Sequence, residues 1–133
     1  MASINPYVQR ELLKGAYVKR RPPYIGDTAA GSYTVKNGES GRTFTNLGNA
    51  GAFTFNLPAN PKKGTVFTFT VQAAQNLVVD PPSGQKIACT VGGTYALQGD
   101  GTAVTANAAG EHLTLECLDG TNWYATTESG TWT

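Results

Sequence analysis

The stretch that decides the fold reads FTFNLPANPKKGTVFTFTVQAAQNLVVDPPSG and covers residues 53–84. In residues 53–57 and 67–71, large apolar side chains alternate with threonine or asparagine. A period of two places successive side chains on opposite faces of a strand, so each segment has one buried and one exposed face. The proline- and lysine-containing segment between them and the double proline near the end are typical of loops. This stretch therefore predicts half-buried strands joined by turns.

The same period of two continues on both sides of this stretch. Further strand candidates outside it are residues 33–36, 43–47, 87–91, 95–97, 104–106 and 113–117, and residues 77–80 are a third candidate within it. Turn sequences rich in glycine, asparagine and aspartate separate them. Many short strands at this spacing predict an all-β fold, either a single β-sandwich or jelly-roll-like domain or a small barrel. A chain of 133 residues suits one such domain.

The N-terminal part of the chain, residues 1–30, differs in character from the rest. Residues 7–19 predict a short helix that Gly15 interrupts, and the two prolines at 22–23 end any helix because proline lacks the amide proton. We therefore expect an extended, partly helical N-terminal arm over residues 1–30, followed by a β domain over residues 31–133. Fully extended, residues 1–22 would reach roughly 70 Å, which is enough to cross a neighbouring subunit.

The arm is strongly basic, although the net charge of the whole chain is only +1. Residues 1–22 hold five bases and one acid, a net charge of +4, whereas the remainder holds five bases and eight acids, or −3. A basic segment on a mildly acidic body indicates a partner of its own, an acidic protein surface or nucleic acid, with a solvated tail as the plain alternative. Because the body lacks a basic face, we do not expect nucleic acid. The expected contact residues are Tyr7, Arg10, Lys14, Tyr17, Lys19, Arg20, Arg21 and Tyr24.

Neither a membrane span nor a secretory signal is expected. No stretch approaches the roughly 18 apolar residues of a membrane span, and the N-terminus lacks a charged start followed by an apolar run. We therefore expect synthesis in a cytoplasm and no membrane partner. Cys89 and Cys117 occupy apolar positions of alternating strands, where a thiol behaves as a small hydrophobic group. A reducing site of synthesis favours buried free thiols over a disulfide.

Patterns for catalysis or metal binding are weak. The single histidine, His112, alternates to the polar side of its strand, and no G-x-S-x-G motif is present to supply a nucleophile. Glu111 and Glu116 lie an odd number of positions apart, so they face opposite sides of one strand and form no glycosidase pair. Two cysteines that are distant in the sequence, with one histidine, do not make a zinc site. We expect no enzyme, no metal and no cofactor.

The closing hairpin leaves the orientation of Trp123 open. A two-residue turn at Asp119-Gly120 pairs Glu116 with Trp123 and turns the indole outward, and a four-residue loop does the same. A three-residue loop with a bulge turns it inward. We expect the outward orientation. Since an exposed indole needs a cover, Trp123 and Trp132 are candidate contacts to another subunit or to a ligand.

The order of elements from Ala52 to the end of the chain resembles small all-β modules of tailed-bacteriophage virion proteins. The resemblance rests on AFTFNLPANPKKG, TVFTFTV, NLVVDPPSG, HLTLECLDGTNWY and SGTWT. Such modules occur in capsid decoration, or cement, proteins and in tail fibres.

The resemblance implies a decoration protein on the outer surface of the virion head. Such a protein is commonly a homotrimer that contacts the major capsid protein and stabilises contacts between capsid subunits. The basic, tyrosine-rich arm and the lack of a coiled-coil or repetitive shaft favour this role. A tail-fibre, head-fibre or host-receptor module that binds glycan is the alternative, and no individual site residue transfers from the resemblance.

Overall fold

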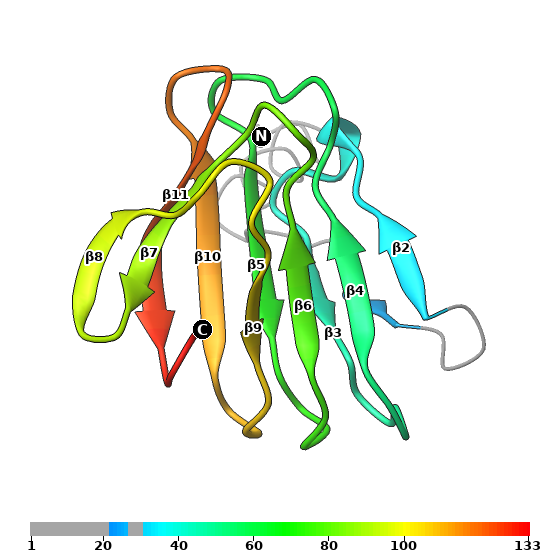
Figure 1. The fold of residues 1–133 in the computed structure, drawn as a ribbon. Coiled ribbons are helices and arrows are strands. Elements are labelled where there is room, and N and C mark those ends of the chain that lie inside the picture. Colours follow the sequence, from blue (N-terminus) through cyan, green and yellow to red (C-terminus); the bar gives the residue numbers. More distant parts are fainter. Residues whose placement is uncertain (1–21, 27–30) are drawn as a thin grey trace, which may run out of the picture.

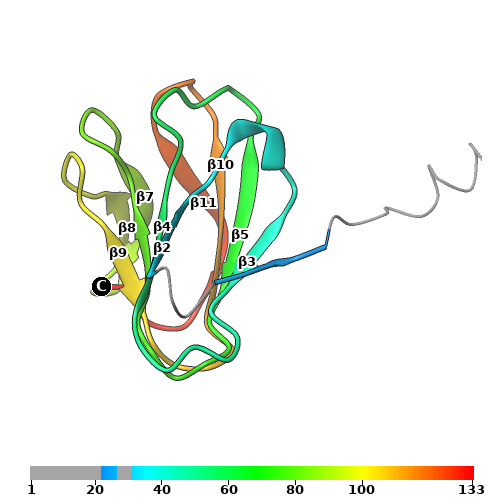
Figure 2. The ribbon, with the colours of Figure 1, turned by 90° about the vertical axis from the view of Figure 1, so that its right-hand side faces the viewer.

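The computed structural model of the chain describes residues 22–26 and 31–133. This described part is nearly all β, with two sheets packed face to face and one short 3₁₀ helix (Figure 1). In the edge-on view of Figure 2, the two sheets form separate layers at the side of the domain nearest the viewer. The prediction of an all-β sandwich-like domain is confirmed.

The larger sheet has seven strands and the smaller sheet has four. The larger sheet runs in the order β1 (Tyr24–Ile25), β3 (Thr43–Thr45), β5 (Val66–Thr70), β10 (His112–Cys117), β11 (Trp123–Ser129), β7 (Ile87–Val91) and β8 (Thr94–Leu97). The smaller sheet runs in the order β2 (Ser32–Thr34), β4 (Phe53–Asn56), β6 (Leu77–Asp80) and β9 (Val104–Ala106). The 3₁₀ helix η1 (Asn37–Glu39) lies between β2 and β3.

The first six strands alternate between the two sheets along the chain. Strands β1, β3 and β5 are parallel neighbours in the larger sheet, and β2, β4 and β6 are parallel neighbours in the smaller one. Each strand in this series is therefore followed by a strand of the other sheet. Every second strand pairs with the previous strand of its own sheet. As a result, the carboxyl ends of β2, β4 and β6 lie at the same end of the smaller sheet.

Phenylalanines from the alternating segments form the centre of the core. Phe53, Phe55, Phe67 and Phe69 are completely buried, as the period of two predicts. Phe44 connects the layers, because its ring centroid lies 5.5 Å from that of Phe55 in the smaller sheet and 5.5 Å from that of Phe69 in the larger sheet. Aromatic pairs at such distances add about 0.5–1.5 kcal/mol each beyond the apolar area that they bury.

Both cysteines are buried free thiols, in agreement with the sequence-based expectation. Cys89 in β7 and Cys117 in β10 belong to the hydrophobic core. Burial raises the pKa of the Cys89 thiol to about 11, and the charge of Glu128 adds to this effect. The pKa of Cys117 is also raised, chiefly by burial.

The prediction that Trp123 faces outward was wrong. Trp123 is completely buried, and it pairs with Cys117 rather than with Glu116. Residues 118–122, an odd number, separate the two paired residues. With an odd number of loop residues, Trp123 lies on the same face of the sheet as the buried Cys117. A loop of two or four residues would place it on the opposite, exposed face. Trp132 is also buried, with 1% of its surface exposed, so neither indole offers a surface to a ligand or to another subunit.

The Asp119 carboxylate explains the longer loop. It accepts hydrogen bonds from the backbone N–H groups of Thr121 and Asn122, at 2.9 and 2.7 Å. The Tyr124 hydroxyl donates to the same carboxylate at 2.8 Å. Asparagine and aspartate side chains commonly bind the backbone two residues ahead in this way, which stabilises a wider turn than a two-residue hairpin.

Candidate functional site at the root of the N-terminal arm

Three of the residues predicted to contact a partner lie in the described part of the chain. Tyr24 is in β1 at the edge of the larger sheet, and Trp123 and Trp132 are in the core. The other arm residues fall outside the described residues: Tyr7, Arg10, Lys14, Tyr17, Lys19, Arg20 and Arg21. The candidate site that the structure describes is therefore residues 22–26, where the chain joins the β domain, and we call this segment the arm root.

Backbone pairing attaches the arm root to the larger sheet. Strand β1 pairs in parallel with β3, so that Ile25 lies opposite Thr45. The Gly26 N–H donates to the Thr45 carbonyl at 2.8 Å. Gly26 is buried, and a Cβ atom at this position would lie 3.0 Å from the ring of Phe53. Glycine therefore allows the backbone to pass directly against the core at this point.

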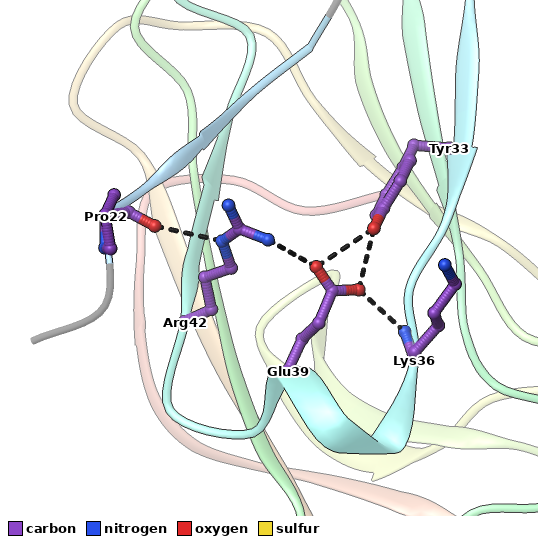
Figure 3. A network of polar contacts seen from close by, with 5 residues as sticks. All are labelled: Pro22, Tyr33, Lys36, Glu39 and Arg42. Carbon is purple, nitrogen blue, oxygen red and sulfur yellow. Dashed lines mark hydrogen bonds and ion pairs between the residues drawn. The ribbon is translucent and has the colours of Figure 1, made fainter.

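The Glu39 carboxylate organises the side chains beside the arm root (Figure 3). It accepts a hydrogen bond from the Tyr33 hydroxyl, which lies 2.9 Å from each carboxylate oxygen. It also accepts one from the backbone N–H of Lys36, at 3.0 Å. It also forms an ion pair with the Arg42 guanidinium. Glu39 is only 8% exposed, and these partners satisfy a buried charge that would otherwise be costly.

Arg42 connects this carboxylate to the arm root. Its Nε–H donates to the Pro22 carbonyl at 2.9 Å, and its guanidinium carbon lies 5.6 Å from the centroid of the Tyr24 ring. The Tyr24 ring stacks on Tyr33, with centroids 4.0 Å apart and an interplanar angle of 23°. The guanidinium and the Tyr24 ring form a cation–π contact of the kind that contributes about 0.5–1 kcal/mol at exposed sites.

The protonation state of Tyr33 keeps this network intact over a wide pH range. Partial burial raises the pKa of Tyr33, and its hydrogen bond to the negatively charged Glu39 raises it further. The hydroxyl therefore remains a donor at neutral and moderately alkaline pH. The chain immediately after the basic segment is thus fixed to the domain by backbone pairing, stacked rings and a charged network.

A second carboxylate, Glu111, lines a hollow of about 580 Å³ on the described surface. It accepts hydrogen bonds from the backbone N–H groups of Asn107, Ala108 and Thr131. Slight burial opposes ionisation, but these N–H groups lower the pKa of Glu111 overall. With its oxygens occupied by backbone donors, Glu111 holds the C-terminal segment in place and is not arranged as an acid or base.

Residues 22–26 and 31–133 contain no cluster of three His, Cys, Asp or Glu side chains that could hold a metal ion. No helix among these residues is long and apolar enough to cross a membrane. No protein-family model and no curated protein matches this chain.

Sequence reasoning missed both Glu39 and Arg42. The sequence does contain a signal for this ion pair. Glu39 and Arg42 are opposite charges three positions apart, on either side of a Ser-Gly turn, in a chain with only 14% charged residues. The link from Arg42 to Pro22 joins residues that are 20 positions apart in the sequence. That contact depends on the parallel pairing of β1 with β3, which local patterns do not reveal.

Proposed function

We propose that this protein is a capsid decoration protein of a tailed bacteriophage, bound to the outer head surface of the virion as a trimer. The basic and tyrosine side chains of the arm contact the major capsid protein, and the β domain is the rigid body that they attach. The observation that supports this proposal best is the fixed arm root, where Arg42 binds both Pro22 and Glu39. An arm that attaches a domain must be joined to it firmly, because a loose tether binds the surface without restraining the domain.

The size of the arm suits such an attachment. A standard specific interface uses about 20–30 residues and buries about 800 Å² on each partner. Residues 1–21 precede Pro22, and the net charge over residues 1–22 is +4. In a symmetric trimer, three arms bind together and each raises the effective concentration of the others. Binding to assembled capsid in preference to free subunits then stabilises the assembled state.

A tail-fibre, head-fibre or host-receptor module is the second candidate function. It is favoured by a hollow of about 310 Å³ whose lining includes Asn56 and Asp80, polar side chains suited to hydroxyl-bearing ligands. This candidate predicts saturable binding to host cells, whereas the decoration role predicts binding to heads.

Co-sedimentation with heads that lack the protein separates these functions. The decoration role predicts stoichiometric pelleting with heads by a species of three times the monomer mass, and weaker pelleting at high salt because the arm contacts are ionic. A protein that ignores heads at both salt concentrations but binds host cells would establish the second candidate instead.

A further inference from the structure

The parallel strands β2, β4 and β6 end side by side at one end of the smaller sheet (Figure 1). The residues at these strand ends line a hollow. Its volume is about 310 Å³. Thr34, Asn56 and Asp80 contribute polar groups to the lining, and the remaining lining is mostly apolar and includes Ala59, Pro81 and Pro82. Ligand sites in proteins share this combination of apolar walls and a few convergent polar groups.

The three polar residues form a row across the strands. Thr34 pairs with Asn56, and Asn56 pairs with Asp80. Neighbouring strands lie about 4.7–4.9 Å apart, so the row spans three strands at that spacing. The preceding residues, Tyr33, Phe55 and Val79, pack in or against the core, which turns the row outward.

None of these three side chains has a hydrogen bond to another residue in the described part of the chain. This differs from the carboxylates described above, Glu39, Glu111 and Asp119, which bind neighbouring backbone or side-chain groups. The hydrogen-bonding capacity of the row is therefore available to a ligand. A threonine hydroxyl donates and accepts, an asparagine amide does both, and an ionised aspartate only accepts.

The chemistry of the lining restricts the ligand to one class. Among the described residues that line the hollow, Asp80 alone carries a formal charge, and its carboxylate disfavours anions. Acceptors beside donors suit a molecule with several hydroxyl groups, and the proline and alanine walls suit the C–H face of a ring. We propose that this hollow binds one sugar unit of a neutral glycan, with hydroxyls bound to Asp80 and Asn56 and the ring against Pro81 and Pro82.

The wall of the hollow is held in place from the core. The Gln85 side-chain amide donates to the carbonyls of Pro58 and Ala59, at 2.8 and 3.1 Å. Gln85 is 4% exposed, and its oxygen accepts the Trp123 indole N–H. A wall fixed in this way loses little conformational entropy when a ligand binds, which favours affinity. Ala59 also lines a second hollow of about 270 Å³, which gives space for a further sugar unit.

This site does not depend on capsid attachment, because it uses no residue of the arm or the arm root. The test is an NMR titration of the whole ¹⁵N-labelled protein with glucose, galactose, mannose and N-acetylglucosamine at millimolar concentrations. N-acetylneuraminic acid serves as the anionic comparison. We expect at least one neutral sugar to cause saturable shifts centred on the backbone amides of Thr34, Asn56, Leu57 and Asp80.

Matched variants then locate the binding. Asp80→Asn removes the carboxylate and is expected to weaken binding at least about tenfold, the equivalent of about 1.4 kcal/mol. Asn56→Ala is expected to weaken it as well. Thr54→Ala is the control, since Thr54 faces outward from the same strand but lies one row away from the hollow, opposite Ser32 and Val78. Unfolding temperatures show whether each variant is folded.

Four results would overturn the proposal. They are no saturable shift with any of the four neutral sugars, unchanged binding by a folded Asp80→Asn variant, tighter binding of the anionic sugar, and loss of binding on addition of EDTA. The last result would mean that a metal ion, rather than the row of side chains, holds the sugar. None of these results bears on whether the arm binds heads, so the two proposals fail separately.

Discussion

The indole N–H of Trp123 donates a hydrogen bond of 2.9 Å to the side-chain oxygen of Gln85, and both residues are buried. The amide nitrogen of the same Gln85 binds the carbonyls of Pro58 and Ala59 in the loop after β4. Trp123, which the sequence pattern places on the surface, is therefore buried in the core and binds the side chain that holds this loop. Through Gln85 it positions a loop that forms the wall of two surface hollows.

This relationship predicts a large effect for Gln85→Ala. The variant loses three hydrogen bonds and leaves the Trp123 indole N–H buried without an acceptor, so the free energy of unfolding should fall by about 2–3 kcal/mol. Urea denaturation measures this change. The control is Gln72→Ala, because the Gln72 side chain is exposed. Equal stability of the two variants would show that the Gln85 hydrogen bonds do not contribute.

Arg42→Lys should loosen the arm root without unfolding the domain. Lysine keeps the positive charge near Glu39 but lacks the planar guanidinium that binds Glu39 and the Pro22 carbonyl together. We expect faster amide hydrogen exchange at Gly26, whose N–H is bonded to Thr45, and unchanged exchange at Leu113 in the core. Unchanged exchange at Gly26 would mean that β1 pairing alone holds the arm root.

The loop between β10 and β11 should respond to acid only at very low pH. Hydrogen bonds from the N–H groups of Asn122 and Thr121, and then from the Tyr124 hydroxyl, lower the pKa of Asp119 from 3.8 to about 2. Because the folded-state pKa is lowered, the loop contacts are fully present above the ordinary pKa and are lost as pH falls through about 2. The amide shifts of Thr121 and Asn122 should therefore titrate with a midpoint near 2.

Asp119→Asn provides the control for this titration, since it removes the ionisable group and should abolish the transition in both amide signals. A midpoint near 4, about the ordinary value for an aspartate, would contradict the hydrogen-bonded loop.

The two cysteines should be unreactive in the folded protein. Cys89 and Cys117 are buried, and burial raises the pKa of both thiols, that of Cys89 to about 11. Both thiols are therefore less ionised at pH 8 than exposed cysteines, and the sheets cover them from the reagent. A colorimetric thiol reagent at that pH should label neither residue in the native state and both in denaturant. Rapid labelling of native protein would show that the sheet around β7 and β10 opens readily.

The strands were predictable because their signal is local. In β4 and β5, the alternation of phenylalanine with threonine identifies both the strand and its buried face. The orientation of Trp123 was not predictable in this way, because one residue more or less in the preceding loop reverses it. The Asp119 side chain, through its contacts with Thr121 and Asn122, favours the odd-numbered loop that is observed.

The site features depend on pairing between distant residues, which local patterns do not contain. Thr34, Asn56 and Asp80 become neighbours only because β2, β4 and β6 are parallel and in register. Arg42 reaches Pro22 only because β1 joins the larger sheet beside β3. The alternation of strands between two sheets creates both arrangements.

The central claim is that the arm attaches the domain to heads, and deletion of residues 2–21 tests it most directly. This deletion keeps Pro22, β1 and the Arg42 contacts, so the domain should stay folded. Co-sedimentation with heads that lack the protein compares the deletion variant with the full chain and with Lys62→Ala/Lys63→Ala, which removes two positive charges from the domain. We predict that the full chain and the double variant pellet with heads and that the deletion variant stays in the supernatant. Full binding by a folded deletion variant would contradict the account.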